Sequence, residues 1–84
     1  MKLTKEEKSW IKRVQKALDA CPSTRLGFAT IGDNDVTIFD HTQYDEICEV
    51  LDRGGSDFLP VAEKLGHVAA ERLIFPNPVE STAG

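Results

Sequence analysis

The sequence lacks a long run of apolar residues, and charged side chains follow Met1 from the second residue onward. A membrane-spanning helix needs about 20 predominantly apolar residues, and a secretory signal needs an apolar segment of its own. Because neither pattern is present, we expect no signal peptide, no membrane partner and a cytoplasmic location. Cysteine is equally scarce: Cys21 and Cys48 are too few for a framework of disulfide bonds and are expected to be reduced thiols.

Sequence signatures of catalysis and of metal or nucleotide binding are also missing. The candidate zinc ligands are separated by 19, 6 and 18 residues, which matches no compact paired-ligand pattern; they are Cys21, His41, Cys48 and His67. The acidic turn at Asp33 lacks the glycine and the glutamate that a calcium loop requires further along. No nucleophile motif surrounds Asp40-His41-Thr42, and Gly54-Gly55 lacks the lysine of a phosphate-binding loop. We therefore expect a protein without cofactors that is not an enzyme.

Eighty-four residues are enough for one small domain but not for two hydrophobic cores. The composition, with 40% hydrophobic and 29% charged residues, is that of a folded globular chain. We expect a single domain over residues 1–76, followed by an exposed tail over residues 77–84. A chain of this size buries roughly 60–65% of its unfolded surface, so its stability is expected to be modest.

Charge is distributed unevenly along the chain. Residues 1–20 hold six basic and three acidic side chains, a net charge of +3. Residues 21–84 hold four basic and eleven acidic side chains, a net charge of −7. The molecule is therefore bipolar rather than uniformly acidic.

The segment from residue 4 to residue 20 has the pattern of an amphipathic helix. Thr4 and Glu7 form a capping box, and Pro22 ends the pattern because it disfavours helical geometry in the residue before it. Apolar residues recur at helical spacing along one side, which comprises Leu3, Trp10, Ile11, Val14, Ala17, Leu18 and Cys21. Four lysines line the opposite side: Lys5, Lys8, Lys12 and Lys16. We expect the apolar side to close the hydrophobic core.

A β-hairpin is predicted within RLGFATIGDNDVTIFDH, residues 25–41. Two stretches rich in β-branched and aromatic residues flank a cluster of turn-forming residues. With Asp33 and Asn34 at the tip, Phe28 faces Phe39, and both lie on the same side of the hairpin. Both sides are apolar, whereas a hairpin with one solvated side alternates apolar and polar residues. We therefore expect the side with Phe28 and Phe39 to be left open for a partner, most simply a second copy of the chain.

Two further helices and a strand are expected after the hairpin. Thr42 can cap a helix that ends at Gly54, and Asp57 can cap a short helix that ends at Gly66. The segment HVAAERLIFP suits a helix by its alanines and a strand by its last residues. We favour a strand near residues 69–75 because a lone hairpin makes a weak sheet. The expected architecture is a small α+β domain in the order helix, hairpin, helix, short helix and strand, with helices on one face of a three-stranded, mainly antiparallel sheet.

Three stretches of the sequence resemble small proteins encoded by tailed phages and prophages. They are KLTKEEKSWIKRVQKALDACPSTRLGFATIGD, LDRGGSDF and FPNPVESTAG, and they span most of the chain. The resemblance assigns no activity and no functional residues. It implies an intracellular accessory protein, made in an infected or lysogenic bacterium, that binds a host or phage protein.

Two functional hypotheses arise from these patterns. The first is a non-enzymatic, homodimeric protein-binding module that acts on a host or phage protein. The second is nucleic-acid binding through the lysines of the N-terminal helix, which the acidic remainder of the chain disfavours. The lysines are either free or paired with acids such as Glu46 and Glu49, within the fold or across a dimer. The candidate interaction residues are Lys5, Lys8, Lys12, Lys16, Phe28, Phe39, Glu46 and Glu49.

Overall fold

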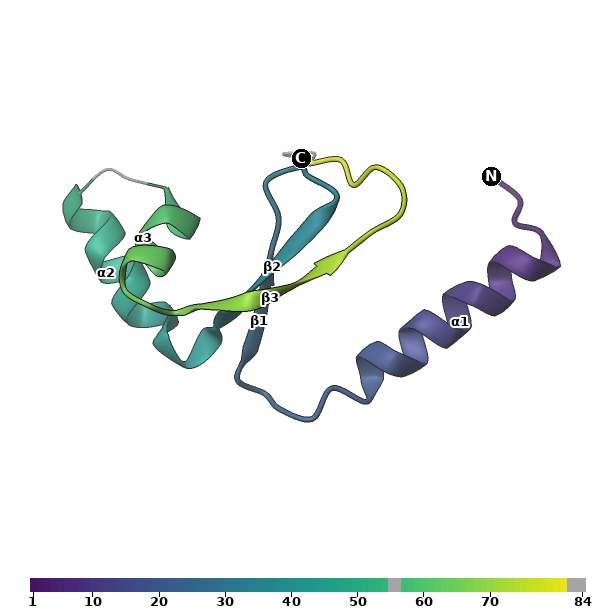
Figure 1. Cartoon of the computed structure of the whole chain (residues 1–84), viewed down its shortest axis with the longest axis horizontal. Helices are drawn as coiled ribbons and strands as arrows, with labels where there is room; N and C mark the ends of the chain where they lie inside the picture. The colour runs from purple at the N-terminus through teal and green to yellow at the C-terminus, as the bar shows by residue number, and fades with distance from the viewer. Residues whose placement is uncertain (55–56, 82–84) are drawn as a thin grey trace.

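The computed structural model describes residues 1–54 and 57–81 of the chain (Figure 1). Its elements are α1 (Lys5–Asp19), β1 (Leu26–Ala29), β2 (Asp35–Asp40), a 3₁₀ turn (His41–Gln43), α2 (Tyr44–Gly54), α3 (Phe58–Lys64) and β3 (Val68–Ile74). The strands form one antiparallel sheet in the order β1-β2-β3. The predicted α+β architecture is confirmed, and the ambiguous last segment is a strand. The positions outside the described part, 55–56 and 82–84, include Gly55 and the end of the predicted tail.

The capping box predicted at the start of α1 is present. The Thr4 hydroxyl accepts a hydrogen bond from the Glu7 amide at 3.1 Å, and the Thr4 amide donates to the Glu7 carboxylate at 2.8 Å. These two bonds satisfy amides that the first turn of a helix otherwise leaves without partners. The helix begins and ends within one residue of the predicted bounds because local sequence alone sets both ends.

The start of α2 differs from the prediction. The carboxylate of Asp40, rather than the hydroxyl of Thr42, caps the 3₁₀ turn that leads into α2, and it accepts hydrogen bonds from the amide and the hydroxyl of Thr42. The bonds from Thr42 lower the pKa of Asp40 below its ordinary value of 3.8. The α2 helix does extend to Gly54, but the left-handed conformation expected there was wrong, because Gly54 is helical and lacks a positive φ. Gly66, with φ of 81°, does follow the end of α3 as predicted.

The hairpin pairs one residue out of the predicted register. Phe28 lies opposite Ile38, and Gly27 lies opposite Phe39. The connecting loop, residues 30–34, is longer than the expected two-residue tip. Because neighbouring residues of a strand point to opposite faces, this register separates Phe28 from Phe39. The prediction that both phenylalanines share one open side was therefore wrong.

The observed register has a physical reason in Gly27. A Cβ atom at this position would lie 2.5 Å from Cζ of Phe39, so only a glycine accepts the aromatic ring directly above it. A second glycine, Gly32, has φ of 94° and supplies the left-handed residue that the loop requires. Glycine opposite a large aromatic residue was the sequence signal that indicated this pairing.

The hydrophobic core lies between the sheet and the α2–α3 pair. Its buried members are Phe39, Ile47, Val61 and Ala62, and partly buried residues surround them: Ala29, Val50, Leu51, Phe58, Leu65 and Val68. The rings of Phe39 and Phe58 meet edge to face with centroids 5.1 Å apart. Phe39, Ala29 and Val68 belong to one face of the sheet, so α2 and α3 cover that face.

The helix α1 stands apart from this core. No residue of α1 is buried, and its side chains Trp10 and Leu18 are 48% and 49% exposed. The α1 helix and the α2–α3 pair lie at opposite ends of the molecule, with the sheet between them (Figure 1). The radius of gyration is 15.5 Å, against about 12 Å for a compact domain of this length. The expectation that α1 closes the core was therefore wrong, because α2 and α3 already fill the covered face.

Candidate functional site

The face of the sheet opposite the core is uncovered by α2 and α3. We call this surface the open sheet face; its larger apolar members, placed by strand alternation and register, are Leu26, Phe28, Val36, Ile38 and Leu73, and Asp40 and Glu71 lie on the same face. Cross-strand pairing sets Phe28 beside Ile38 and Val36 beside Leu73, which makes the surface continuous. Phe28 is 49% exposed, whereas Phe39 belongs to the core. Of the two predicted surface phenylalanines, only Phe28 is available to a partner.

The second apolar surface is the side of α1 that was expected to face the core. We call it the apolar side of α1; its helical members are Trp10, Ile11, Val14, Ala17 and Leu18. At about 100° per residue these positions form one arc, with the lysine stripe roughly opposite. Trp10, Ile11 and Leu18 are all exposed, and Val14 is half-buried. A fully amphipathic helix therefore presents both of its sides to solvent.

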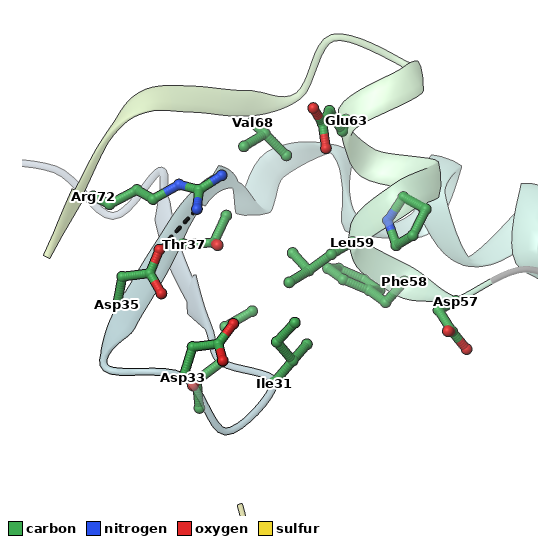
Figure 2. A pocket seen from close by; sticks show the side chains of 13 residues that line it. Ile31, Asp33, Asp35, Thr37, Asp57, Phe58, Leu59, Glu63, Val68 and Arg72 are labelled. Atoms are coloured by element: carbon green, nitrogen blue, oxygen red, sulfur yellow. Dashed lines mark hydrogen bonds and ion pairs between the residues drawn. The ribbon is translucent and has the colours of Figure 1, made fainter. Parts of the chain in front are cut away.

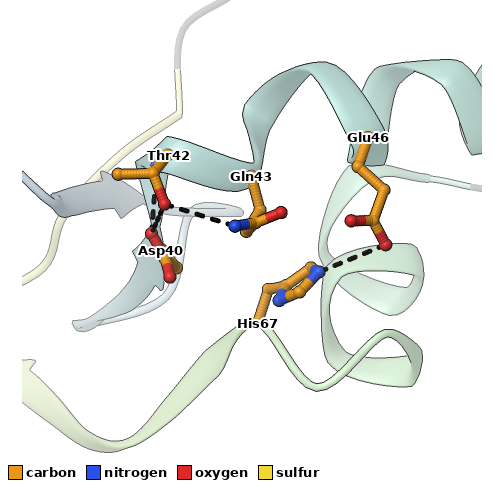
Figure 3. A network of polar contacts seen from close by, with 5 residues as sticks. All are labelled: Asp40, Thr42, Gln43, Glu46 and His67. Atoms are coloured by element: carbon orange, nitrogen blue, oxygen red, sulfur yellow. Dashed lines mark hydrogen bonds and ion pairs between the residues drawn. The ribbon is translucent and has the colours of Figure 1, made fainter.

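Among the described residues, the lysines of α1 have no acidic partners. Within residues 1–54 and 57–81, no ion pair involves Lys5, Lys8, Lys12 or Lys16. Glu49 pairs with Arg53 on the same helix. Glu46 Oε1 lies 3.3 Å from Nε2 of His67 (Figure 3). The structure forms no pair between these lysines and Glu46 or Glu49, because α1 and α2 lie at opposite ends of the molecule (Figure 1).

The cysteines and histidines that were weighed as metal ligands lie in separate places. Cys21 follows α1 and contacts the carbonyl of Ser23, whereas Cys48 lies on α2 beside Tyr44. A hydrogen bond with the Cys48 thiol raises the pKa of Tyr44. The ring of His41 stacks on Tyr44 with centroids 5.2 Å apart. Among the described residues no group of three or more His, Cys, Asp or Glu side chains is arranged for a metal ion.

A cavity of about 440 Å³ lies between the hairpin loop and α3 (Figure 2). Ile31, Phe58 and Leu59 form its apolar wall, and four carboxylates line it: Asp33, Asp35, Asp57 and Glu63. The Arg72 guanidinium donates to the Asp35 carboxylate at 2.7 Å. The cavity was not predicted because its lining comes from the hairpin, α3 and β3, which only the tertiary structure brings together.

The ion pair in this cavity makes a pH-dependent contribution to folding. The hydrogen bond from Arg72 lowers the pKa of Asp35 below its ordinary value of 3.8. A carboxylate with a lowered pKa stabilises the folded state above its unfolded pKa, and the contribution is lost as pH falls through the lowered value. The Asp35–Arg72 pair is therefore formed at neutral pH and contributes to stability there.

No protein-family model, curated protein or solved structure matches this chain. Within the described residues, none of the helices has the length and apolar character needed to cross a membrane.

Proposed function

We propose that this protein is a non-enzymatic protein-binding module, an accessory protein of a phage or prophage that acts on a host or phage protein. The phage origin rests on the sequence resemblance alone. The observation that carries the binding function is the pair of uncovered apolar surfaces, the open sheet face and the apolar side of α1. Extended apolar surfaces with a polar rim mark protein interaction sites, since monomers rarely leave them exposed.

The composition of these surfaces supports protein binding in particular. Trp10 and Phe28 are aromatic and about half exposed, and aromatic side chains that become buried on association carry much of the binding energy in protein interfaces. Arg13 borders the apolar side of α1 at helical spacing and gives it a charged edge. This is the arrangement of an apolar centre with a polar border that protein interfaces share.

Pull-down from a bacterial lysate tests the binding function with a matched pair of variants. The double variant Trp10→Ala/Leu18→Ala shortens the apolar side of α1, and we expect it to retain about tenfold less of any specific partner than the parent chain. The control Lys8→Ala/Lys16→Ala changes the opposite side of the same helix and should retain the partner after nuclease treatment. Equal retention by the two variants would contradict the proposed function.

A second candidate function is nucleic-acid binding through α1. The observation that favours it is that Lys5, Lys8, Lys12 and Lys16 lie on one exposed side without acidic partners among the described residues. Four lysines that neutralise four phosphates would give a log–log salt dependence of the affinity with a slope of about −3.6. The acidic remainder of the molecule opposes this function through its net charge of −7.

A gel-shift assay tests the second candidate. Lys12→Glu lies at the centre of the lysine stripe and is expected to weaken the shift of DNA or RNA by about tenfold, because it removes one phosphate contact and adds a repulsion. Lys64→Glu on α3 is the matched control and should leave the shift unchanged. Nucleic-acid binding is ruled out if the parent chain gives no shift at about 50 mM salt.

A further inference from the structure

We propose that two copies of this chain exchange their N-terminal helices, so that the apolar side of α1 from each copy packs on the open sheet face of the other. In this pairing a second copy occupies the two apolar surfaces, and the dimer is the form that acts on the host or phage protein. The pairing rests on the proposed binding function. Three properties of the structure support it: the dimensions of the two surfaces, the excess exposed area and the distribution of charge.

The two surfaces match in size. Three strands spaced by about 4.8 Å make a face roughly 14 Å wide, and the seven residues of β3 extend it to roughly 23 Å. A helix of 15 residues is about 22 Å long and about 10 Å across. One copy of α1 therefore covers the open sheet face of another copy, with Trp10 and Leu18 in reach of Phe28 and Leu73.

The exposed area also exceeds the area expected of a compact monomer of the same mass. A compact chain of 9.3 kDa is expected to expose about 5,000 Å², whereas this chain exposes 6934 Å². The difference, roughly 1,900 Å², is more than twice the ~800 Å² that each partner buries in a standard protein interface. In the exchanged dimer each copy buries area at two places, on its own α1 and on its own open sheet face.

Charge favours the same partner. Exchange places a segment of net charge +3 against a body of net charge −7, which steers association between copies. Glu71 lies on the open sheet face by strand alternation, and its carboxylate is exposed. Arg13, at the margin of the apolar side of α1, is the cation expected to approach it. An anionic membrane would also accept a basic amphipathic helix, but it would leave the open sheet face uncovered.

The linker between α1 and β1 has contacts of its own, and α1 stands apart from its own sheet (Figure 1). The Cys21 amide donates to the Leu18 carbonyl at 3.0 Å, and Pro22 prevents the helix from continuing. The Arg25 amide donates to the Ser23 hydroxyl at 3.0 Å, and the Arg25 carbonyl accepts from the His41 amide at 2.7 Å. With these contacts kept, α1 points away from the sheet (Figure 1). Reciprocal exchange then closes a two-fold dimer without refolding the linker.

Sedimentation of the full chain between about 1 and about 100 µM tests the exchange, because dimerisation depends on concentration. We expect the mass to rise toward twice 9.3 kDa. Trp10→Glu and Phe28→Glu should each weaken the dimer by about tenfold or more. Ile31→Glu changes an exposed residue of the hairpin loop, outside both surfaces, and should leave the dimer unchanged.

Mixing the two monomeric variants provides the sharper test. In an exchanged pair, the intact α1 of the Phe28→Glu copy can pack on the intact sheet of the Trp10→Glu copy. We therefore expect the mixture to form a heterodimer at concentrations where each variant alone is monomeric. A dimer that survives Phe28→Glu but is lost with Trp10→Glu would show helix-to-helix pairing and would overturn the exchange.

A spin label on Cys21 covers the case in which a variant fails to fold. Cys21 is exposed next to the end of α1, and Cys48 is the other free cysteine. A Cys48→Ala copy that carries the spin label on Cys21, mixed with an isotope-labelled Cys21→Ser/Cys48→Ala copy, therefore reports contacts between copies. Exchange predicts broadening of amide signals in β1 and β3 of the isotope-labelled copy, which carries no spin label. A chain that stays monomeric up to about 100 µM, without such broadening, would overturn the exchange; a lysate partner lost with Trp10→Ala/Leu18→Ala would then still support the proposed function.

Discussion

Replacing Ile47 with alanine is expected to lower the free energy of unfolding by about 2–5 kcal/mol. Ile47 is 0% exposed and is the largest fully buried side chain among the described residues. Truncation there removes buried methyl groups and leaves a cavity among Phe39, Val61 and Ala62, which complete the buried core. A chain of 84 residues has a total stability of about 4–13 kcal/mol, so this single change removes a large part of it.

Urea unfolding followed by far-ultraviolet circular dichroism measures the effect. Tryptophan fluorescence is unsuitable because the only tryptophan, Trp10, is exposed on α1 and outside the core. Ile74→Ala is the matched control: the same atoms are removed from a side chain that is 80% exposed, and we expect a change within about 0.5 kcal/mol. Similar losses for the two variants would contradict the location of the core.

Replacing Gly27 with alanine is expected to destabilise the fold by about 1–3 kcal/mol through overpacking. The added methyl group would lie 2.5 Å from Cζ of Phe39 and within 2.9 Å of two further ring atoms. The ring cannot move away freely, because Phe39 is buried and packs edge to face against Phe58. The strand must shift or the ring must leave its rotamer, and either change disturbs the sheet face that contacts α2 and α3.

Gly54→Ala provides a control of opposite sign. Gly54 is helical, and a Cβ atom there would meet no atom of the described residues within 4 Å. Alanine is therefore expected to stabilise the protein by about 0.5–1 kcal/mol, because it reduces the freedom of the unfolded chain. Urea midpoints of both variants give the comparison. Tolerance of alanine at position 27 would indicate a different register, and with it a different set of residues on the open sheet face.

The substitution of Gly27 bears on function because the register of β1 decides which residues reach a partner. The predicted hairpin placed Phe28 and Phe39 together on the outside, whereas the structure keeps Phe28 outside and uses Phe39 in the core. A shift of one residue moves a whole strand to the other face. The sequence did contain the relevant signal, since Gly27 is the residue that leaves room for an aromatic ring.

The sequence by itself determined the elements whose causes are local. The capping box of Thr4 and Glu7, the helical spacing of α1 and the strand-forming residues of β3 all produce the predicted structure. These features depend on hydrogen bonds and side-chain spacing within a few residues, which any tertiary arrangement preserves. The amphipathic character of α1, with lysines on one side and Trp10 on the other, could be predicted from the sequence for the same reason.

Only the tertiary structure decided which apolar surfaces are covered. Several segments can bury an apolar side against one sheet, and their competition for a single face is settled by packing rather than by local pattern. Here α2 and α3 occupy that face, so α1 keeps its apolar side exposed and Phe28 faces outward. Glu46 and Glu49 contact His67 and Arg53, and no lysine of α1 is paired with an acid among the described residues. An amphipathic pattern predicts a helix, but whether its apolar side is core or interface depends on what else fills the space.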